Sequence, residues 1–442
     1  MKTKEMENIQ QAFKEKMDYD ELLNCMRCGF CLPSCPTYIE SGKDEAHSPR
    51  GRIALMKAVV DGEIEPDEDV KRSLDMCLGC RACEPVCPSG VNYGHLLEQA
   101  RDIIYQNKKP SLPARVIRKS VFYGLFPYQN RLISMTGLLG LYQRSGLQKM
   151  TQKSGILNLL PDSMQLMERV LPKVPTRKEM KNRPYHLPAI TPKKKKVAFF
   201  SGCLMDTMFL HTNDATTKLL QVAGCEIVIP KSQNCCGAIH GHSGEKKKGK
   251  ALAKQNIQAF EEAEVDYIIT NAGGCGAFLV DYGHLLQDEP EWKERAKAFS
   301  AKIKDISSIL VELDFHKTPL KVEDQIVTFQ DSCHLRNVQR IFLEPRKLLS
   351  SIEGVHYVEM KDADRCCGSA GIYNIVESDM SMKILDYKME QTKATNAKTI
   401  VTANPGCLLQ MKLGIEKEGL SNTVRAVHIV DFLLEAFEKT NG

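Results

Sequence analysis

The chain has almost no tryptophan and no long apolar segment, and both shortages narrow its class. One tryptophan occurs in 442 residues. No uncharged apolar run reaches the roughly 18 residues that a membrane-spanning helix needs. The first residues lack the apolar stretch of a secretory signal, so a reducing, cytoplasmic environment is expected. In that environment, grouped cysteines indicate metal binding or catalysis rather than disulfides.

Nucleotide-binding fingerprints are also missing. No Gly-x-Gly-x-x-Gly motif opens a helix after an expected strand, and the glycine-rich segment 241–250 has neither that spacing nor the Walker pattern. If hydride chemistry takes place, the flavin or nicotinamide is therefore expected on another subunit. The net charge of +5 does not by itself indicate nucleic acid, and no nucleic-acid partner is expected.

Cysteine, in contrast, is abundant, with 17 residues, and the first eight form two identical motifs. Each motif reads Cys-x2-Cys-x2-Cys-x3-Cys-Pro, which is the bacterial ferredoxin pattern. Three closely spaced thiolates surround one [4Fe–4S] cluster, and the fourth reaches the other cluster. Zinc favours two Cys-x2-Cys pairs instead. We therefore expect two clusters, the first on Cys25, Cys28, Cys31 and Cys87, and the second on Cys77, Cys80, Cys83 and Cys35.

The insert between the two motifs, residues 36–76, predicts the helical kind of ferredoxin module. It contains a proline helix start at Pro49 and apolar residues near helical spacing. Such modules connect a flavoprotein to another acceptor. Arg50 and Arg52 in this insert suit either a docking face or, as the simpler interpretation, a solvated helix face.

The C-terminal half is an internal repeat. Cys203 matches Cys333 at an offset of 130 residues, the Cys-Cys-Gly (CCG) segments match at 131, and Cys275 matches Cys407 at 132. This small drift indicates a duplication. Strands alternate with helices in each copy, which predicts parallel α/β units with cysteines just beyond strand ends, where ligands bind. Cys225 falls within a strand and is expected in the core.

Each repeat offers four thiols as a binding site. They are Cys203, Cys235, Cys236 and Cys275 in the first copy, and Cys333, Cys366, Cys367 and Cys407 in the second. Three interpretations remain open: a further Fe–S cluster in at least one repeat, zinc in one repeat, or redox thiols without metal. Beside the doublets, His240, His242 and Tyr373 suit proton donation or quinone binding, although ordinary loop residues are the simpler interpretation.

The segment between the ferredoxin module and the repeats is strongly basic. Residues 101–196 hold 20 Lys and Arg but 4 Asp and Glu. Ile117, Val121 and Leu125 follow helical spacing, and Arg115, Arg118 and Lys119 lie mostly off that stripe. The pattern suits an anionic membrane surface or an acidic partner, or a helical linker that packs on its own domains.

Several motifs together resemble the iron–sulfur subunit of glycolate oxidase. They are the first cysteine motif followed by Thr-Tyr, PRGRI, CLGCRACEPVCPSGV, NAGGCGAF, CCGSAG and TANPGC, in that order along nearly the whole chain. The architecture also resembles the iron–sulfur subunits of anaerobic glycerol-3-phosphate dehydrogenase and the D subunit of heterodisulfide reductase. In heterodisulfide reductase, each CCG motif ends in Cys-x2-Cys. Here Ala272 and Asn404 replace one cysteine of each pair, which weakens the transfer of a disulfide-reducing cluster.

The resemblance implies an electron-transfer subunit of an oxidoreductase complex, with no catalytic residue of its own. A separate FAD-containing subunit would oxidise glycolate to glyoxylate. This chain would pass the electrons to a membrane acceptor such as quinone, as a peripheral protein on the inner face of the cytoplasmic membrane. The expected domains are a helical ferredoxin module (1–106), a basic helical linker (107–195) and two α/β CCG repeats (196–320 and 321–442).

Overall fold

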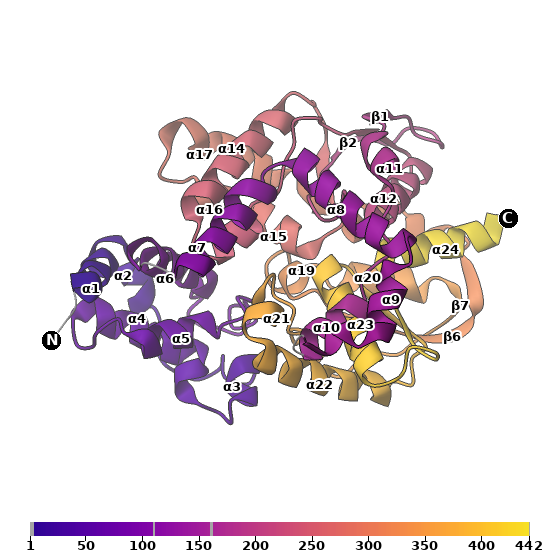
Figure 1. Ribbon diagram of the computed structural model, residues 1–442. Helices are drawn as coiled ribbons and strands as arrows, with labels where there is room; N and C mark the ends of the chain where they lie inside the picture. The colour runs from indigo at the N-terminus through magenta and orange to yellow at the C-terminus, as the bar shows by residue number, and fades with distance from the viewer. Residues whose placement is uncertain (1–3, 109–110, 160–161, 442) are drawn as a thin grey trace.

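The computed structural model describes residues 4–108, 111–159 and 162–441. A helical N-terminal region lies beside two α/β units (Figure 1). No strand occurs between residues 4 and 108, which confirms the predicted helical module. Its elements are α1 (Lys4–Lys16), α2 (Tyr19–Leu23), α3 (Pro36–Glu40), the 3-10 turn η1 (Glu45–His47), α4 (Pro49–Asp61), α5 (Glu68–Asp75) and α6 (Tyr93–Asn107).

The sequence explains where the helices around the cysteine loops begin and end. Ser48 caps α4 by accepting from the Gly51 amide, Pro49 occupies its first turn, and Gly62 ends it with a φ of 81°. Asp67 caps α5 in the same way. The first cysteine loop lies between α2 and α3, and the second lies between α5 and α6. One expectation is wrong: Arg52 is fully buried rather than on a solvated face.

The basic segment crosses the front of both α/β units in Figure 1. It contains α7 (Leu112–Arg118), the π-helix η2 (Lys119–Leu125), α8 (Gln129–Arg144), α9 (Leu147–Ser154), the 3-10 turn η3 (Ile156–Leu159), α10 (Asp162–Arg169) and α11 (Arg177–Lys181). It is not entirely helical, because β1 (His186–Leu187) pairs antiparallel with the first unit's sheet. Among the described residues, every helix is too short or too polar to cross a lipid bilayer.

The two units share one topology, as the repeat predicts. The first contains β2 (Lys195–Phe199), α12 (Leu210–Val222), β3 (Cys225–Val228), α13 (Ala238–His242), α14 (Lys246–Glu261), β4 (Tyr267–Thr270), α15 (Gly273–Val280), α16 (Tyr282–Leu285), α17 (Pro290–Ala301), β5 (Ile303–Asp305) and α18 (Ile306–Glu312). After the turn η4 (Phe315–Lys317), the second contains β6 (Lys321–Gln330), α19 (Cys333–Asn337), α20 (Leu343–Ser350), β7 (Glu353–Tyr357), α21 (Tyr373–Val376), α22 (Ser378–Ala394), β8 (Thr399–Thr402), α23 (Pro405–Lys417), β9 (Arg425–His428) and α24 (Ile429–Asn441).

Equivalent strands occupy equivalent positions in the two sheets. The orders are β1-β3-β2-β4-β5 and β7-β6-β8-β9, and every pairing except that of β1 is parallel. The units also exchange helix contacts, since α24 packs on α12 and α18 packs on α20. One hydrophobic core therefore runs through both units, with Phe199 from one sheet and Phe329 from the other. This packing turns the carboxyl ends of both sheets toward a common region.

Candidate metal centre

The two ferredoxin-like loops have matching backbones. Arg27 (φ 56°) and Gly29 (φ 89°) in the first loop correspond to Gly79 (φ 64°) and Arg81 (φ 58°) in the second. A left-handed residue thus stands at both matching positions, even though glycine and arginine exchange places. Because non-glycine residues adopt this conformation at a cost, both loops are held in the same shape by their surroundings.

The first predicted set of cysteines gathers near the surface. Cys25, Cys28, Cys31 and Cys87 line one small pocket, together with Pro49 and Tyr93. Cys28 is exposed. Leu23, Met26, Phe30 and Val86 next to this pocket are also exposed, between 40% and 67%. This end of the module therefore presents both thiols and apolar side chains to the outside.

The second predicted set lies deeper. Cys35, Cys77 and Cys83 are buried. Burial is the largest cause of the raised pKa of Cys80 and Cys83, and nearby thiols, Cys35 among them, raise both values further. The Tyr93 hydroxyl donates to the Cys77 sulfur at 3.5 Å.

Two arginines lie beside Cys77 of this set, and Arg52 is fully buried while Arg101 is half-buried. Burial acts to raise the pKa of Cys77, but Arg52 and Arg101 lower it below its ordinary value. The guanidinium of Arg52 donates to the Ser73 carbonyl and the Thr37 hydroxyl, and its Nη1 has no hydrogen-bond partner among the described residues. Both arginines thus favour a negatively charged group at Cys77.

The CCG cysteines of each repeat come together as predicted from the alignment. Cys203 follows β2, the doublet Cys235–Cys236 follows β3, and Cys275 lies in the first turn of α15. Their thiols lie close together in the order 203, 235, 236, 275. The second repeat has the equivalent arrangement in the order 333, 366, 367, 407.

The glycine after each doublet is required by the backbone. Gly237 has a φ of 90° and Gly368 a φ of 92°. A Cβ atom at Gly368 would lie 2.7 Å from the Ser381 carbonyl oxygen, and one at Gly237 would lie 3.4 Å from the Cα of Gly249. Left-handed backbone and a closely packed helix thus explain the third residue of each CCG motif.

All eight CCG cysteines line a single cavity of about 800 Å³, which we call the chamber. Cys77 of the second ferredoxin-like loop lines the same chamber, as do residues of α5, α6 and α7. Thiolate-rich sites favour zinc or iron–sulfur clusters among biological metal groups. The neighbouring thiols Cys235 and Cys366, followed by burial, raise the pKa of Cys203 and Cys333. These two thiols therefore keep their protons unless a metal displaces them.

The second loop docks directly on the second repeat. The Asn337 side chain donates to the Cys80 carbonyl at 2.9 Å, and the His334 Nε2–H donates to the Gly79 carbonyl at 3.0 Å. The Tyr373 hydroxyl donates to the Met76 carbonyl at 3.1 Å. Burial is the largest cause of the raised pKa of Cys80, and the nearby Cys333 thiol is the next largest. The buried ferredoxin-like set therefore adjoins the CCG thiols.

The remaining candidate residues, Cys225, His240 and His242, lie in different surroundings. Cys225 is fully buried at the start of β3, away from the chamber, which confirms it as a core residue. His240 is buried and donates to the Phe122 carbonyl at 2.8 Å, whereas His242 lines the chamber. No three His, Cys, Asp or Glu side chains of the described ranges are placed as ligands of one metal ion.

Sequence reasoning missed the polar contacts around the second cysteine loop. Arg52 and Arg101 beside Cys77, and Asn337 beside Cys80, act across distances of 24 to 257 residues in the chain. Arg52 lies in the PRGRI segment, so its place in a shared motif was the one available signal. For Asn337 no pattern in the sequence indicates the contact.

Comparisons with known proteins agree with this geometry. Three family models match: a 4Fe-4S dicluster domain at residues 21–91, the linker region of glycolate oxidase iron-sulfur subunits at 113–171, and a cysteine-rich domain at both 197–280 and 327–412. A probable glycolate oxidase iron-sulfur subunit from Bacillus subtilis (strain 168) is 71% identical over 434 residues, which is 98% of each chain. The chain belongs to the glycolate oxidase iron–sulfur subunit family.

More distant relatives extend the comparison. The glycolate oxidase iron-sulfur subunit of Escherichia coli (strain K12) is 32% identical over 98% of this chain and 100% of its own length. A lactate utilization protein A from Exiguobacterium is 32% identical over 55% of this chain and 98% of its own length. Membership in the glycolate oxidase family confirms the resemblance, and the dicluster and cysteine-rich matches support iron–sulfur binding with two CCG repeats.

Proposed function

We propose that this chain is the electron-transfer subunit of a glycolate-type 2-hydroxyacid oxidase complex. An FAD-containing partner oxidises the hydroxyacid, and this chain passes the electrons to a membrane acceptor such as quinone. The observation that carries the proposal is a continuous series of thiols. Exposed Cys28 shares a pocket with Cys83, Cys83 lies near Cys77, and Cys77 lines the chamber with the CCG cysteines. Anaerobic purification with the flavoprotein, followed by a metal count, tests it. Turnover of a disulfide by this chain alone would instead favour a heterodisulfide-reductase-like activity.

We assign the two [4Fe–4S] clusters to the sets predicted above. Cys25, Cys28, Cys31 and Cys87 hold the first, in support of which they line one pocket. Cys77, Cys80, Cys83 and Cys35 hold the second, which is supported by the closeness of Cys35 to Cys80 and Cys83. Arg52 lies near both Cys35 and Cys77. When bound, such clusters accept and donate single electrons. The exposed apolar residues around the first set suit docking of the flavoprotein.

Exchanging single ligands should separate the two clusters. In anaerobically prepared full-length protein, Cys28→Ser removes a ligand of the first set only, and Cys80→Ser removes one of the second. We expect each variant to lose one of the two EPR signals and to lower the iron content by at least one iron per chain. Each variant serves as the experimental control for the other, since both replace a motif cysteine by serine. Stoichiometric zinc without iron in the wild type would refute the assignment.

We further propose that the CCG thiols bind a metal group, preferably an Fe–S cluster. Four thiols in contact in each repeat and the shared chamber support this assignment. Zinc in one repeat is the alternative, because zinc accepts four thiolates. It would require the thiols to move around one ion, since no three of these described thiols are placed as ligands of a single metal ion. Metal analysis of the purified chain separates iron beyond the two cubanes from zinc.

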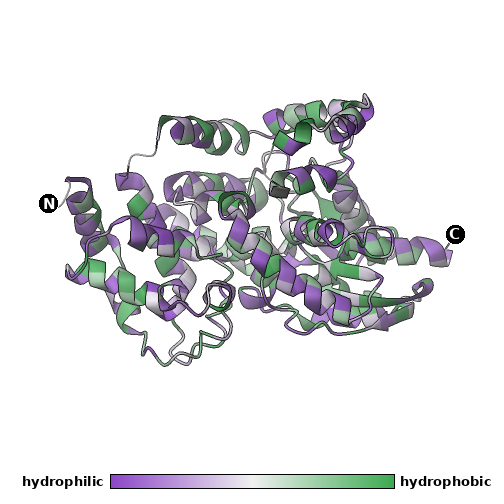
Figure 2. Ribbon diagram, turned by 60° about the horizontal axis from the view of Figure 1, so that its bottom comes forward, coloured by the Kyte–Doolittle hydropathy of each residue, from purple (hydrophilic) through white to green (hydrophobic). Residues whose placement is uncertain are grey.

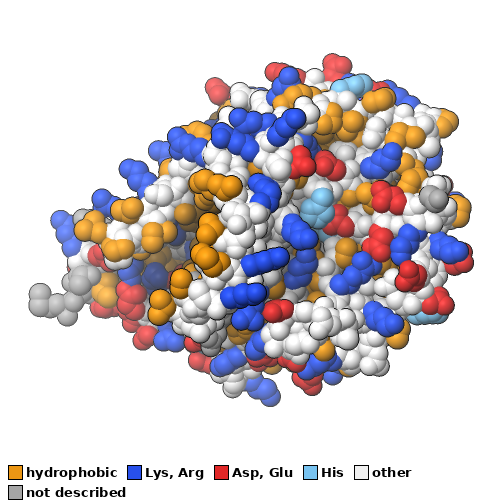
Figure 3. Space-filling view, turned by 45° about the vertical axis from the view of Figure 1, so that its right-hand side comes forward, with side chains coloured by type: hydrophobic (Ala, Val, Ile, Leu, Met, Phe, Trp, Pro, Cys, Tyr) orange, Lys and Arg blue, Asp and Glu red, His pale blue; other side chains and the backbone are white. Residues whose placement is uncertain are grey.

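We propose that the linker brings the complex to the inner membrane surface. Exposed apolar and basic side chains alternate along it, and Figure 3 shows such orange and blue side chains together on one face. Figure 2 shows α7 and η2 at the outer edge of the molecule, with hydrophobic residues along them. The exposed apolar residues are Leu112, Val116, Ile117, Tyr123, Tyr128, Met135, Leu138, Leu141, Leu147, Met150, Ile156, Leu159 and Met164.

Arg118, one of the three basic residues proposed for the membrane surface, instead contacts the protein's own first repeat and α6. Arg118 pairs with Glu245 at 3.1 Å and stacks on Tyr105 at 3.4 Å, so it docks the linker on the first repeat. Arg115 and Lys119 are exposed. Ile117 of the apolar stripe is 64% exposed, so the stripe faces outward at this position. The packed residue of this segment is Phe122, which is 3% exposed.

Vesicle binding should therefore depend on Arg115 and Lys119. Each basic residue near anionic lipid contributes about 1 kcal/mol, so replacing both by glutamine should weaken binding roughly tenfold to thirtyfold. Binding should also fall with salt, because the attraction is screened over about 8 Å at physiological ionic strength. Co-sedimentation with anionic vesicles measures both effects. Lys321→Gln with Lys398→Gln, two exposed lysines of the second repeat, controls for net charge. Equal binding to neutral vesicles would leave the linker as a packing surface.

A further inference from the structure

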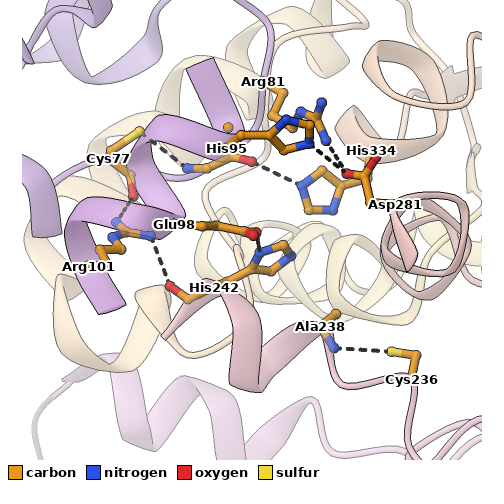
Figure 4. A network of polar contacts seen from close by, with 12 residues as sticks. Cys77, Arg81, His95, Glu98, Arg101, Cys236, Ala238, His242, Asp281 and His334 are labelled. Carbon is orange, nitrogen blue, oxygen red and sulfur yellow. Dashed lines mark hydrogen bonds and ion pairs between the residues drawn. The ribbon is translucent and has the colours of Figure 1, made fainter. Parts of the chain in front are cut away.

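One hydrogen bond connects the chamber to a second, smaller pocket. The Nδ1–H of His242 donates to Oε1 of Glu98 at 2.7 Å, across the contact between α13 and α6. Glu98 lines the smaller pocket, and His242 lines the chamber. Figure 4 shows this bond between the two side chains, near Arg101 and His334. The pair joins two spaces that are otherwise lined by different residues.

The smaller pocket is rich in groups that bind or exchange protons. His95, Asp281, His284 and Lys246 line it with Glu98. The rings of His95 and His284 stack with their centres 3.6 Å apart. The side chains of His95, Glu98 and Asp281 are between 19% and 30% exposed, so water reaches them. This pocket therefore supplies an entrance for protons beside Glu98.

His242 is held with one ring nitrogen uncommitted. Its Nε2 is buried and has no hydrogen-bond partner among the described residues. Arg101 donates to the His242 carbonyl at 3.2 Å, and the Phe278 ring meets the imidazole edge-on, so both fix the residue. The His334 ring lies 5.2 Å away, centre to centre. An unpaired ring nitrogen on a histidine that lines the chamber suits donation to a bound molecule.

We propose that Glu98 and His242 deliver protons to a quinone-type acceptor that is reduced in the chamber. This inference rests on the proposed function, which supplies the electrons. Quinone takes up two electrons and two protons, one at each carbonyl oxygen, and leaves as quinol. His242 is the donor at Nε2. Glu98 is a positioning residue that accepts from Nδ1, stabilises the charged ring and returns protons from the smaller pocket.

The direction of the Glu98 pKa shift agrees with the two roles proposed for Glu98 and His242. Burial acts to raise the pKa of Glu98, but the hydrogen bond and charge of His242 lower it below its ordinary value. Asp281, between α15 and α16, and His95, on the same helix as Glu98, also act on Glu98. An ionised Glu98 therefore accepts the Nδ1–H of His242, while the Nε2 of that ring has no partner among the described residues. The eight CCG thiols cannot replace this donor if they are metal ligands, because metal binding removes their protons.

Reoxidation of the reduced chain separates proton delivery from electron transfer. Full-length protein with its clusters is reduced anaerobically, freed of reductant and mixed with either a short-chain ubiquinone or ferricyanide, which accepts one electron and no proton. We expect Glu98→Gln and His242→Gln to slow reoxidation by quinone at least tenfold, since positioned acid groups contribute about 10²–10⁴-fold. Reoxidation by ferricyanide should stay within twofold of the wild type. Added imidazole should restore part of the quinone rate in His242→Ala.

The chain provides a matched control for this experiment. His186 and Glu226 form another histidine–carboxylate pair at 3.2 Å, on the exposed edge of the first sheet. His186→Gln and Glu226→Gln should leave both rates unchanged. Equal slowing with both oxidants, or no slowing with quinone, would overturn the proton path while the proposed function stands. A wild type that ferricyanide reoxidises but quinone does not would overturn the acceptor in the proposed function and the path with it.

Discussion

Replacing Cys366 and Cys367 together by serine is expected to reduce electron transfer through the chain roughly a hundredfold or more. Even groups that only support metal ligands typically cost about 10–100-fold when mutated, and these two are proposed ligands. Both are 2% exposed, and their thiols contact Cys333 and Cys407. Reduction of the acceptor by the assembled complex measures the loss. The metal content should fall as well, while the EPR signals of the two cubanes remain.

Cys225→Ser is the control for this double change. Cys225 is fully buried, like the doublet, but it lies in β3 and does not line the chamber. Its replacement introduces the same buried hydroxyl without removing a proposed ligand. If the doublet variant keeps its metal content and transfers electrons as Cys225→Ser does, the CCG cysteines are structural. Loss of zinc rather than iron would establish the zinc alternative.

The repeat was predictable because its landmarks are chemically distinctive and evenly spaced. Cysteine and glycine in the order Cys, CCG, Cys occur at nearly constant offsets, and each falls beside a β-branched strand. Parallel α/β units bring strand ends together, so the alignment alone placed Cys203 and Cys275 near the doublet. The structure adds that both repeats and Cys77 share one chamber. That feature depends on how separate units dock, which no local pattern encodes.

Contacts between domains were the part that sequence reasoning could not reach. The Arg118–Glu245 pair spans 127 residues, and the Glu98–His242 pair spans 144. A basic residue in an amphipathic segment has the same pattern whether it faces lipid, solvent or a carboxylate on another domain. The sequence therefore leaves open whether Arg118 faces lipid, an acidic partner or its own domains, and the structure shows that it holds the linker on the first repeat. The short β1 was missed because two residues are too few to show an alternating pattern.

The burial of Arg52 was likewise not visible in the sequence. Its position suggests that replacing it should have a large effect on the second cluster. Its guanidinium is fully buried, and it donates to the Ser73 carbonyl at 2.7 Å and the Thr37 hydroxyl at 3.1 Å. Burial acts to lower the pKa of Arg52, but Cys77, Tyr93 and Cys35 raise it above its ordinary value. A buried cation thus stands beside the proposed ligands of the second cluster.

We expect Arg52→Gln to make the second cluster harder to reduce. Reduction adds negative charge near Arg52, whose Nη1 has no hydrogen-bond partner among the described residues. A hydrogen bond from this nitrogen to a charged cluster would contribute about 1.5–3 kcal/mol, or roughly 60–130 mV for one electron. An EPR-monitored redox titration should show this fall in the second cluster's potential and little change in the first.

Stability should change together with the potential. Removing one partner of a buried charge pair typically costs about 3–5 kcal/mol, so Arg52→Gln should also unfold at a lower denaturant concentration. Arg72→Gln on α5 is the control, because Arg72 is exposed and the same charge is lost. A variant with the wild-type potential but lower stability would make Arg52 a purely structural residue. A variant unchanged in both would mean that the negative charge of the second cluster lies elsewhere, which would contradict the assignment of Cys77 and Cys35 as its ligands.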